Sequence, residues 1–310
     1  MKEGFRMSAL KGVWVPALTP QNSDLLIDKN RFFHHLDWLF NHEIDGAVLF
    51  GSNGEANSFS VEERMLLLEW AKNESVPNDK VMVGTGCSAL TDTIALIEHA
   101  IGLGYFNHLV LPPFYYKNPS VNGLVNNYSE IINRIDNKDL KIYLYNFPQL
   151  SGIALSVDLV EILSEKFPKN IVGYKDSSGD WDNTSQIMEK FPQINMFPGS
   201  EIFLSKALEK GAAGVITGTG NVNPGMVKQT YEAFYNDKKK SIILQKKIDD
   251  FRTAVQKYPL ISALKGLIEY YRKDEGWQYL RPPLTALPEA DLKNLIQSID
   301  PLEFSLKAKF

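Results

Sequence analysis

Residues 141–176, with the sequence KIYLYNFPQLSGIALSVDLVEILSEKFPKNIVGYKD, decide the predicted fold. The stretch opens with a short apolar and aromatic run at 141–145 and ends with a second such run at 171–175. Between the two runs, Ser156 is followed by leucine and isoleucine at helical spacing up to residue 163. A strand, a helix and a second strand in this order form the repeating unit of an α/β fold with parallel strands.

The same alternation of short apolar runs and helical patterns extends over most of the chain. In addition to these two runs, strands are expected at residues 12–18, 45–50, 80–85, 107–111, 195–197 and 213–217. Eight strands separated by helices, at about 25–30 residues per unit, predict a (β/α)8 barrel, or TIM barrel. A doubly wound open sheet is the alternative, but it needs a G-x-G-x-x-G turn, which the sequence GSNG at 51–54 lacks.

The C-terminal quarter of the chain follows a different pattern. It contains no further strand pattern, and three helices are expected at residues 240–256, 259–273 and 289–299. We therefore expect an α/β fold in which residues 1–236 form the (β/α)8 TIM barrel with the active site and residues 237–310 form a C-terminal three-helix extension.

Composition excludes several classes of protein. The 310 residues include 33 Lys and Arg against 37 Asp and Glu, a net charge of −4 without the basic excess of a nucleic-acid-binding protein. Gly, Asn and Pro interrupt the apolar stretch at 211–227, so no membrane span is expected. The segment 1–12 carries charges and no apolar core, so no signal peptide is expected. Together with a single cysteine, Cys87, this favours a cytoplasmic protein without disulfides.

Neither a metal ion nor a bound cofactor is expected. The chain has five histidines, and no predicted strand end combines one of them with a carboxylate, as a metal site in a barrel would need. The G-x-S-x-G sequence of a serine nucleophile is absent as well. These absences direct attention to amines and phenols at the strand ends.

Lys175 is the strongest catalytic candidate. In a TIM barrel the reacting groups gather at the carboxyl ends of the strands, and Lys175 follows an apolar run directly before a turn of small residues. Partial removal from water favours a neutral amine, which attacks a ketone to form a Schiff base. Tyr145 ends the preceding strand and offers a phenol for proton transfer. The alternative interpretation is a structural lysine held in a salt bridge.

Two further strand ends carry polar groups suited to a site. The sequence GSNGE at 51–55 sets Ser52 and Asn53 between two glycines, and such a turn exposes backbone N–H groups beside two side-chain donors that can bind a carboxylate. A turn followed by a helix cap is the alternative. Tyr115 and Tyr116 follow two prolines after the fourth strand, where packing in the core or an interface explains them equally well.

These motifs together resemble one family, the pyruvate-dependent class I aldolases and lyases, which includes dihydrodipicolinate synthase and N-acetylneuraminate lyase. The resemblance extends from about residue 12 to residue 299. The motifs that carry it are ALTP at 17–20, GSNGE at 51–55, PFYY at 113–116, YNFP at 145–148, GYKDSSG at 173–179, GVI at 214–216 and RPPL at 281–284.

The resemblance implies a role for each matched residue. Lys175 matches the Schiff-base lysine, and Tyr145 matches the tyrosine that moves protons to and from the carbon and the aldehyde oxygen. Ser52 and Asn53, with the backbone at Gly54, match the group that holds the pyruvate carboxylate. No separate cofactor is implied, because the Schiff base forms with the substrate itself.

The remaining matches concern specificity and assembly. Tyr116 matches a tyrosine that reaches the site of a neighbouring subunit in many members, although counting from Pro113 selects Tyr115 instead. The backbone carbonyl of Ile216 is expected to line the site. Three residues fall where sugar-cleaving members bind hydroxyl groups: Thr217, Ser200 and Glu201. The family also implies a homotetramer built from two tight dimers.

The sequence departs from the family pattern at three positions. Asn53 replaces a threonine, so it can donate to a carboxylate but cannot relay a proton. Leu150 stands where dihydrodipicolinate synthases carry the arginine that binds an acidic acceptor. Ser200 replaces an acidic residue that sugar-cleaving members often use, although the sequence YNFPQLSG at 145–152 is closer to that branch.

We therefore expect a pyruvate-dependent Schiff-base aldolase or lyase acting on a 2-keto-3-deoxy sugar acid, sialic acid or a related 4-hydroxy-2-oxo acid. Loss of water from a keto-deoxy acid through the same Schiff base stays open. One alternative is a dihydrodipicolinate synthase that condenses pyruvate with aspartate semialdehyde. Another is a catalytically weak barrel that binds a small molecule.

Overall fold

Eight parallel strands form the centre of the molecule in a computed structural model that describes residues 10–302, 304 and 306. The strands are β1 Gly12–Pro16, β2 Gly46–Leu49, β3 Val81–Gly84, β4 Asn107–Val110, β5 Lys141–Asn146, β6 Ile171–Asp176, β7 Asn195–Pro198 and β8 Gly214–Ile216. From β1 to β7 each strand pairs with the next one in the sequence, β8 pairs with β1, and the gap lies between β7 and β8. The backbone N–H of Ala213 donates to Met196 O at 2.9 Å beside the remaining gap, so the barrel is nearly closed.

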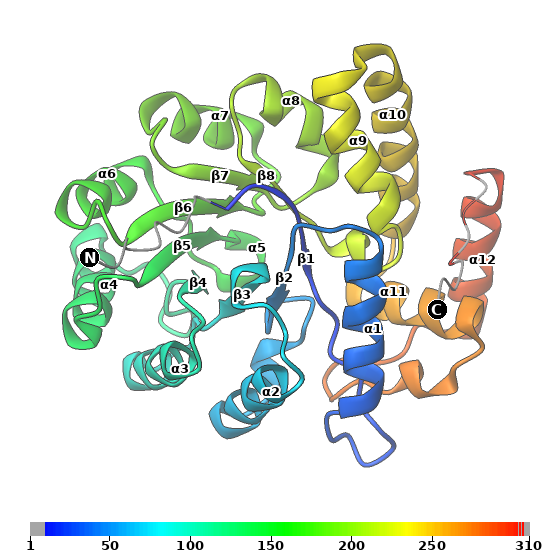
Figure 1. Cartoon of the computed structure of the whole chain (residues 1–310), viewed down its shortest axis with the longest axis horizontal. Helices are drawn as coiled ribbons and strands as arrows, with labels where there is room; N and C mark the ends of the chain where they lie inside the picture. Colours follow the sequence, from blue (N-terminus) through cyan, green and yellow to red (C-terminus); the bar gives the residue numbers. More distant parts are fainter. Residues whose placement is uncertain (1–9, 303, 305, 307–310) are drawn as a thin grey trace.

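The predicted TIM barrel is thus confirmed, because the strand order follows the chain order without the reversal of a doubly wound sheet. The helices surround the strands (Figure 1). They are α1 Lys29–Asn41, α2 Val61–Asn73, α3 Leu90–Gly102, α4 Val121–Ile135, α5 Pro148–Ser151, α6 Val157–Lys166, α7 Trp181–Lys190, α8 Leu204–Glu209 and α9 Pro224–Asn236.

Two large rings fill the barrel interior beside glycines. Trp14 of β1 and Tyr143 of β5 are almost fully buried. A Cβ atom at Gly46 would lie 2.3 Å from the Trp14 ring, and one at Gly173 would lie 2.0 Å from the Tyr143 ring. The glycines therefore leave the space that the rings occupy. Because side chains alternate along a strand, Tyr145 also faces inward, one level nearer the carboxyl end.

The C-terminal part contains α10 Lys238–Val255, α11 Leu260–Arg272 and α12 Glu289–Ile299, which lie together on one side of the barrel (Figure 1). Ile248 of α10, Leu264 of α11 and Leu295 of α12 belong to the same buried apolar cluster as Val13 of β1. The extension and the barrel therefore share a core, and the division of the chain at residue 236 stays a prediction.

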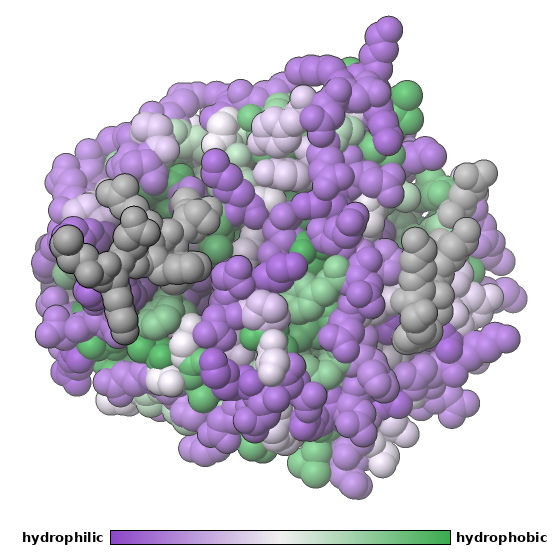
Figure 2. All heavy atoms as spheres, in the orientation of Figure 1, coloured by the Kyte–Doolittle hydropathy of each residue, from purple (hydrophilic) through white to green (hydrophobic). Residues whose placement is uncertain are grey.

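The surface agrees with a chain that folds around an internal core. Figure 2 shows one face covered mainly by hydrophilic side chains, with apolar residues in small areas between them. In the described part of the chain, no helix has the length and apolar character needed to cross a membrane. Residues 1–9, which contribute to the prediction of a cytoplasmic protein, lie outside the described residues.

Candidate active site

Lys175 lies near the carboxyl end of β6, and its side chain faces Tyr145 on β5. The two residues are direct partners in the parallel register of these strands. Lys175 is 2% exposed, and its Nζ atom lies 4.2 Å from the centroid of the Tyr145 ring. No carboxylate among the described residues forms an ion pair with this amine, so the salt-bridged interpretation has no support there. The geometry instead sets an amine beside a phenol inside the mouth of the barrel.

The turn that follows β2 brings its polar residues to the same place. The hydroxyl oxygens of Ser52 and Tyr145 are 3.1 Å apart, a hydrogen bond that joins the turn to β5. Asn53 packs against the backbone of the segment after β8, where a Cβ atom at Gly218 would lie 2.8 Å from Asn53 Nδ2. A hydrogen bond fixes the backbone of Gly54, because Thr19 Oγ1 donates to Gly54 O at 2.8 Å. The structure thus brings together the amine, the phenol and the turn that the sequence singled out.

A buried ion pair stabilises the turn at 51–55. Glu55 adopts a left-handed backbone conformation with φ of 56°, and its carboxylate is paired with the ammonium of Lys265 on α11. Lys265 is fully buried, and this burial lowers its pKa, while Glu55 acts in the opposite direction. Gln21 Nε2 donates to the other carboxylate oxygen at 3.1 Å. The sequence analysis missed Lys265, because it lies inside an apolar helical pattern 210 residues from its partner.

Asp176 fixes the end of β6 next to Lys175. Its carboxylate accepts four hydrogen bonds: from Asn146 Nδ2 at 3.1 Å, Ser178 N at 2.9 Å, Asn183 Nδ2 at 2.8 Å and Thr184 Oγ1 at 2.9 Å. These bonds join the ends of β5 and β6 to the start of α7. The strand ends that carry Tyr145 and Lys175 are therefore held rigidly.

A cavity of about 290 Å³ opens over Lys175. Its walls include residues from several separate parts of the chain, among them Asn53, Tyr145, Ser200, Arg252, Gln256 and Leu260. The predicted Ser200 therefore reaches the cavity. Arg252 and Gln256 on α10 were not predicted, because nothing in the helical pattern of residues 238–255 indicates which face meets the barrel mouth.

Three other predicted residues lie behind the cavity wall. Glu201 and Thr217 are fully buried, and the Glu201 carboxylate accepts hydrogen bonds from the hydroxyls of Thr217 and Thr219. Ile216 is also fully buried and belongs to the apolar cluster inside the barrel that includes Tyr145. These three side chains are not part of the described cavity lining, and the expected role of the Ile216 backbone carbonyl stays a prediction.

Comparison with known proteins agrees with this arrangement. The sequence model of the dihydrodipicolinate synthetase family matches residues 9–301. The chain belongs to this family. An uncharacterised DapA-like lyase of Chloroflexus aurantiacus is 34% identical over 74% of this chain and 76% of its own length. A 4-hydroxy-tetrahydrodipicolinate synthase of a Hydrogenobaculum species is 30% identical over 66% of this chain and 68% of its own length.

The fold is shared with solved members of the dihydrodipicolinate synthetase family. The dihydrodipicolinate synthase of Agrobacterium tumefaciens superposes with a TM-score of 0.87 at 27% identity, over 94% of this chain and 99% of that one. The chain is therefore an enzyme of a family of lyases, aldolases and synthases.

Three positions that matter for the family resemblance lie away from the cavity. Tyr115 and Tyr116, on the loop between β4 and α4, are 73% and 80% exposed, and their rings contact each other edge to face at 5.3 Å. Leu150 on α5 is 63% exposed. None of the three lines the cavity described above, so any contribution of the two tyrosines to a site requires a second molecule.

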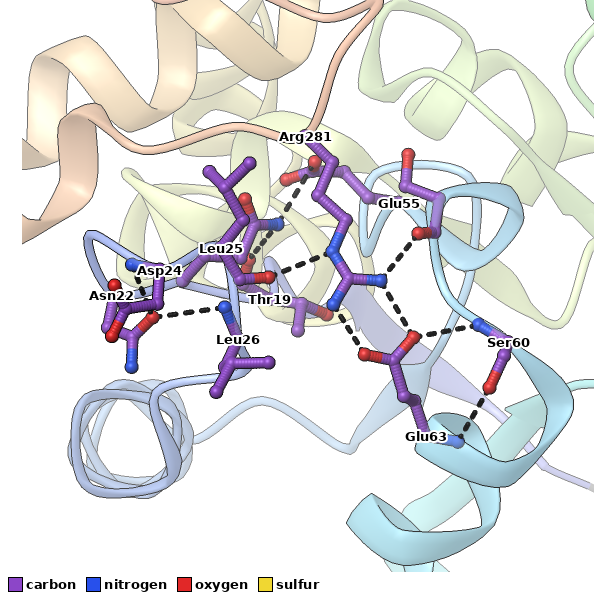
Figure 3. A network of polar contacts seen from close by, with 11 residues as sticks. Thr19, Asn22, Asp24, Leu25, Leu26, Glu55, Ser60, Glu63 and Arg281 are labelled. Carbon is purple, nitrogen blue, oxygen red and sulfur yellow. Dashed lines mark hydrogen bonds and ion pairs between the residues drawn. The ribbon is translucent and has the colours of Figure 1, made fainter.

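Arg281, in the late family motif at 281–284, contacts residues that follow the turn at 51–55. Arg281 Nη1 donates to Ser58 O at 2.8 Å and to Glu63 Oε2 at 2.7 Å, and its Nε donates to Leu25 O at 2.9 Å (Figure 3). Ser60 and Glu63 also form a capping box at the start of α2. One arginine thus joins the C-terminal segment to α2 and to the loop before α1.

No described group of three or more His, Cys, Asp or Glu side chains is arranged to hold a metal ion. His35 and His108 are fully buried, and burial lowers the pKa of each to about 3. Both histidines therefore stay neutral at neutral pH. The absence of a metal or a bound cofactor from the reaction stays a prediction.

Proposed function

We propose that this protein makes or breaks a carbon–carbon bond next to the carbonyl of a 2-oxo acid, through a Schiff base between pyruvate and Lys175. The observation that carries this proposal is the contact of the buried Lys175 amine with Tyr145, whose hydroxyl is bonded to Ser52. An amine, a phenol and a carboxylate-binding turn at one barrel mouth are the groups that this chemistry needs.

The proposed reaction begins when the neutral amine of Lys175 attacks the pyruvate C2 carbonyl. Tyr145 gives its proton to the departing hydroxyl, so that water leaves and an iminium forms. The iminium withdraws electrons from C3, and the Tyr145 phenolate takes up the C3 proton to give the enamine. The enamine carbon then attacks an aldehyde, and the Tyr145 hydroxyl gives its proton to the new alkoxide oxygen. Cleavage is the reverse sequence, and water finally releases the product from Lys175.

The turn at 51–55 would hold the pyruvate carboxylate. Ser52 Oγ and the amide of Asn53 supply side-chain donors, and the tight backbone at Gly54 supplies N–H groups on the same side. Asn53 cannot relay a proton as a hydroxyl does. The proton path therefore runs through Tyr145 and Ser52 alone within one chain.

For the substrate, we propose a 2-keto-3-deoxy sugar acid, sialic acid or a related 4-hydroxy-2-oxo acid. The support is Leu150, an exposed leucine where synthases carry an arginine for the acidic acceptor. The alternative is a 4-hydroxy-tetrahydrodipicolinate synthase, which is the printed activity of the Hydrogenobaculum relative. A barrel that binds a small molecule with weak or no turnover is the second alternative.

Reductive trapping tests the central proposal. The protein is incubated with pyruvate, reduced with borohydride and digested, and the peptides are weighed by mass spectrometry. We expect one pyruvate adduct, on Lys175. A protein that carries no adduct on this lysine would not use the proposed chemistry. A condensation assay with aspartate semialdehyde, set against sugar aldehydes, then separates the synthase from the aldolase.

We also propose a homotetramer composed of two dimers. The support is the pair Tyr115 and Tyr116, whose exposed rings would be covered by a second copy. Light scattering gives the mass in solution, and a monomer at all concentrations would contradict this proposal.

A further inference from the structure

Arg252 is the cation in the cavity that the proposed pyruvate chemistry does not use. Lys175 and Arg252 are the basic residues in the described lining, and Asp176 is the acidic one. Asp176 is already occupied by its four hydrogen bonds. The described lining beyond Lys175 therefore carries a positive charge and no free carboxylate, and the Glu201 carboxylate that partly balances this charge is not part of the lining.

The guanidinium of Arg252 has donors to spare. Within the described part of the chain, neither of its terminal nitrogens makes a hydrogen bond, and Nη1 is buried. Glu201 Oε2 lies 3.6 Å from Nη1, but Glu201 is not part of the cavity lining, and its oxygens already accept from Thr217 and Thr219. The Nε atom has only a long contact of 3.5 Å with Gln256 Oε1. The Arg252 side chain is 14% exposed, and its guanidinium lacks a bidentate partner.

The position of Arg252 is fixed by its helix. Gln245, Arg252 and Gln256 recur at intervals of seven and four residues, so they share the face of α10 that is turned towards the barrel mouth. Gln245 Nε2 donates to Glu201 O at 2.8 Å, and Gln245 Oε1 accepts from Ser205 N at 3.0 Å. On the adjoining face, Ile248 and Phe251 are buried in the core. The guanidinium is therefore held at the cavity before any substrate arrives.

We infer that Arg252 binds a carboxylate at the far end of the acceptor, so that the acceptor aldehyde is an oxo acid and the condensed product carries a carboxylate at both ends. This inference rests on the proposed function, since it assigns the second substrate of the same site. A single guanidinium, partly balanced by Glu201, matches one negative charge. A phosphate ester carries between 1.5 and 2 charges at neutral pH and would require a second cation, which the described lining lacks.

Arg252 thereby supplies from α10 what Leu150 does not supply from α5. Arg252 lines the cavity and Leu150 does not, so the lack of an arginine at 150 does not remove recognition of an acidic acceptor. Among the substrates proposed above, Arg252 therefore favours the 4-hydroxy-2-oxo acids that carry a second carboxylate over the keto-deoxy sugar acids and sialic acid, whose acceptor aldehydes are neutral.

Matched aldehydes test this assignment. Condensation with pyruvate is measured for glyoxylate and 4-oxobutanoate, each against its methyl ester, and for glycolaldehyde phosphate against glycolaldehyde. Three proteins are compared: the natural chain, Arg252→Gln, and Lys246→Gln as a control. Lys246 lies on the same helix, and its side chain is 76% exposed and paired with Asp250. Thermal melting of each protein shows that it is folded.

We expect the natural protein to prefer at least one oxo acid over its ester in kcat/KM. Arg252→Gln should lower this ratio by about 10-fold or more, since it removes a charge-assisted bidentate contact, and Lys246→Gln should not change it. The inference is overturned if the natural protein shows no such preference, if Arg252→Gln lowers both rates equally, or if the phosphate ester is preferred and loses more. Trapping of pyruvate on Lys175 separates these failures from failure of the proposed function, because the adduct forms without an acceptor.

Discussion

Two regions of the barrel carry tyrosines that match the family: the end of β5, beside the ends of β2 and β6, and the loop between β4 and α4. The two regions differ in how far their side chains are buried and in what those side chains contact. At the strand ends, Tyr145 and Lys175 are each 2% exposed and contact each other. On the loop, Tyr115 and Tyr116 are 73% and 80% exposed and contact mainly each other. The strand ends therefore form a finished arrangement within one chain, while the loop presents aromatic surface that only another molecule can bury. The groups of the proposed chemistry and the proposed contact with a second copy therefore lie in separate regions of the barrel.

The largest effect should come from the strand ends. Lys175→Arg keeps the charge but removes the amine that can form a Schiff base, so kcat/KM should fall by at least about 10³-fold and the pyruvate adduct should disappear. Lys141→Arg is the control, since Lys141 begins β5 at the other end of the barrel. If Lys175→Arg turned over substrate at a rate close to that of the natural protein, Lys175 would not be the reacting amine, and the strand ends would not differ from the loop in reactivity.

The support beneath the turn at 51–55 should show the next largest effect. Lys265→Met leaves the Glu55 carboxylate buried without its cation, so the free energy of unfolding should fall by about 3–5 kcal/mol. Urea unfolding measures this value. Lys246→Met, which breaks an exposed ion pair, should cost less than about 1 kcal/mol. In the double variant with Glu55→Gln, much of the lost stability should return, and a loss equal to that of Lys265→Met would show that charge is not the cause.

Acid should weaken the strand-end region through His35. Its Nε2 lies 3.0 Å from Asn221 Oδ1, and Asn221 Nδ2 donates to Pro16 O at 2.9 Å at the end of β1. Burial lowers the pKa of His35 to about 3, so below about pH 6.5 the unfolded chain takes up a proton that the folded chain refuses. Stability is therefore complete above this pH and falls as the pH drops towards 3, by about 2 kcal/mol between pH 7 and 5 from this residue alone.

A matched pair of variants checks this assignment. His35→Gln should reduce the loss of melting temperature between pH 7 and 5, while His34→Gln, an exposed neighbour on α1, should leave it as in the natural protein. Equal acid sensitivity of all three proteins would mean that other groups, such as the buried His108, account for it.

The smallest effect on stability should come from the loop. Tyr115→Ser and Tyr116→Ser remove side chains that are mostly exposed, so each should change the free energy of unfolding of the single chain by at most about 0.5 kcal/mol. Light scattering of the same variants should show weaker self-association than the natural protein. A loss above about 2 kcal/mol at concentrations where the chain is monomeric would show that the loop packs against its own barrel, and the contrast with the strand ends would disappear.

The sequence predicted the strand-borne part of the site because strands and their ends can be located from local patterns. Lys175 and Tyr145 each follow an apolar run, and the register of β5 and β6 makes them direct partners. Arg252 and Lys265 could not be found this way, since each lies within an ordinary helical pattern and reaches its place only through tertiary packing. The family resemblance assigned Glu201 and Thr217 to substrate binding. In the structure, the Thr217 hydroxyl donates to the Glu201 carboxylate, and neither residue is part of the cavity lining. A local sequence pattern shows which end of a strand a residue occupies. It does not show which face of a helix far away in the sequence packs against that strand end.

The ion pair between Glu55 and Lys265 has a consequence for the growing chain. The two residues are 210 positions apart, so at about 5–20 residues per second Glu55 leaves the ribosome roughly 10 to 40 s before its partner is made. During that interval the carboxylate cannot be buried without a large cost, and the turn beside it must stay hydrated. The barrel mouth is therefore completed only near the end of translation, and a nascent chain stalled before α11 would expose this edge of the barrel to chaperones and proteases.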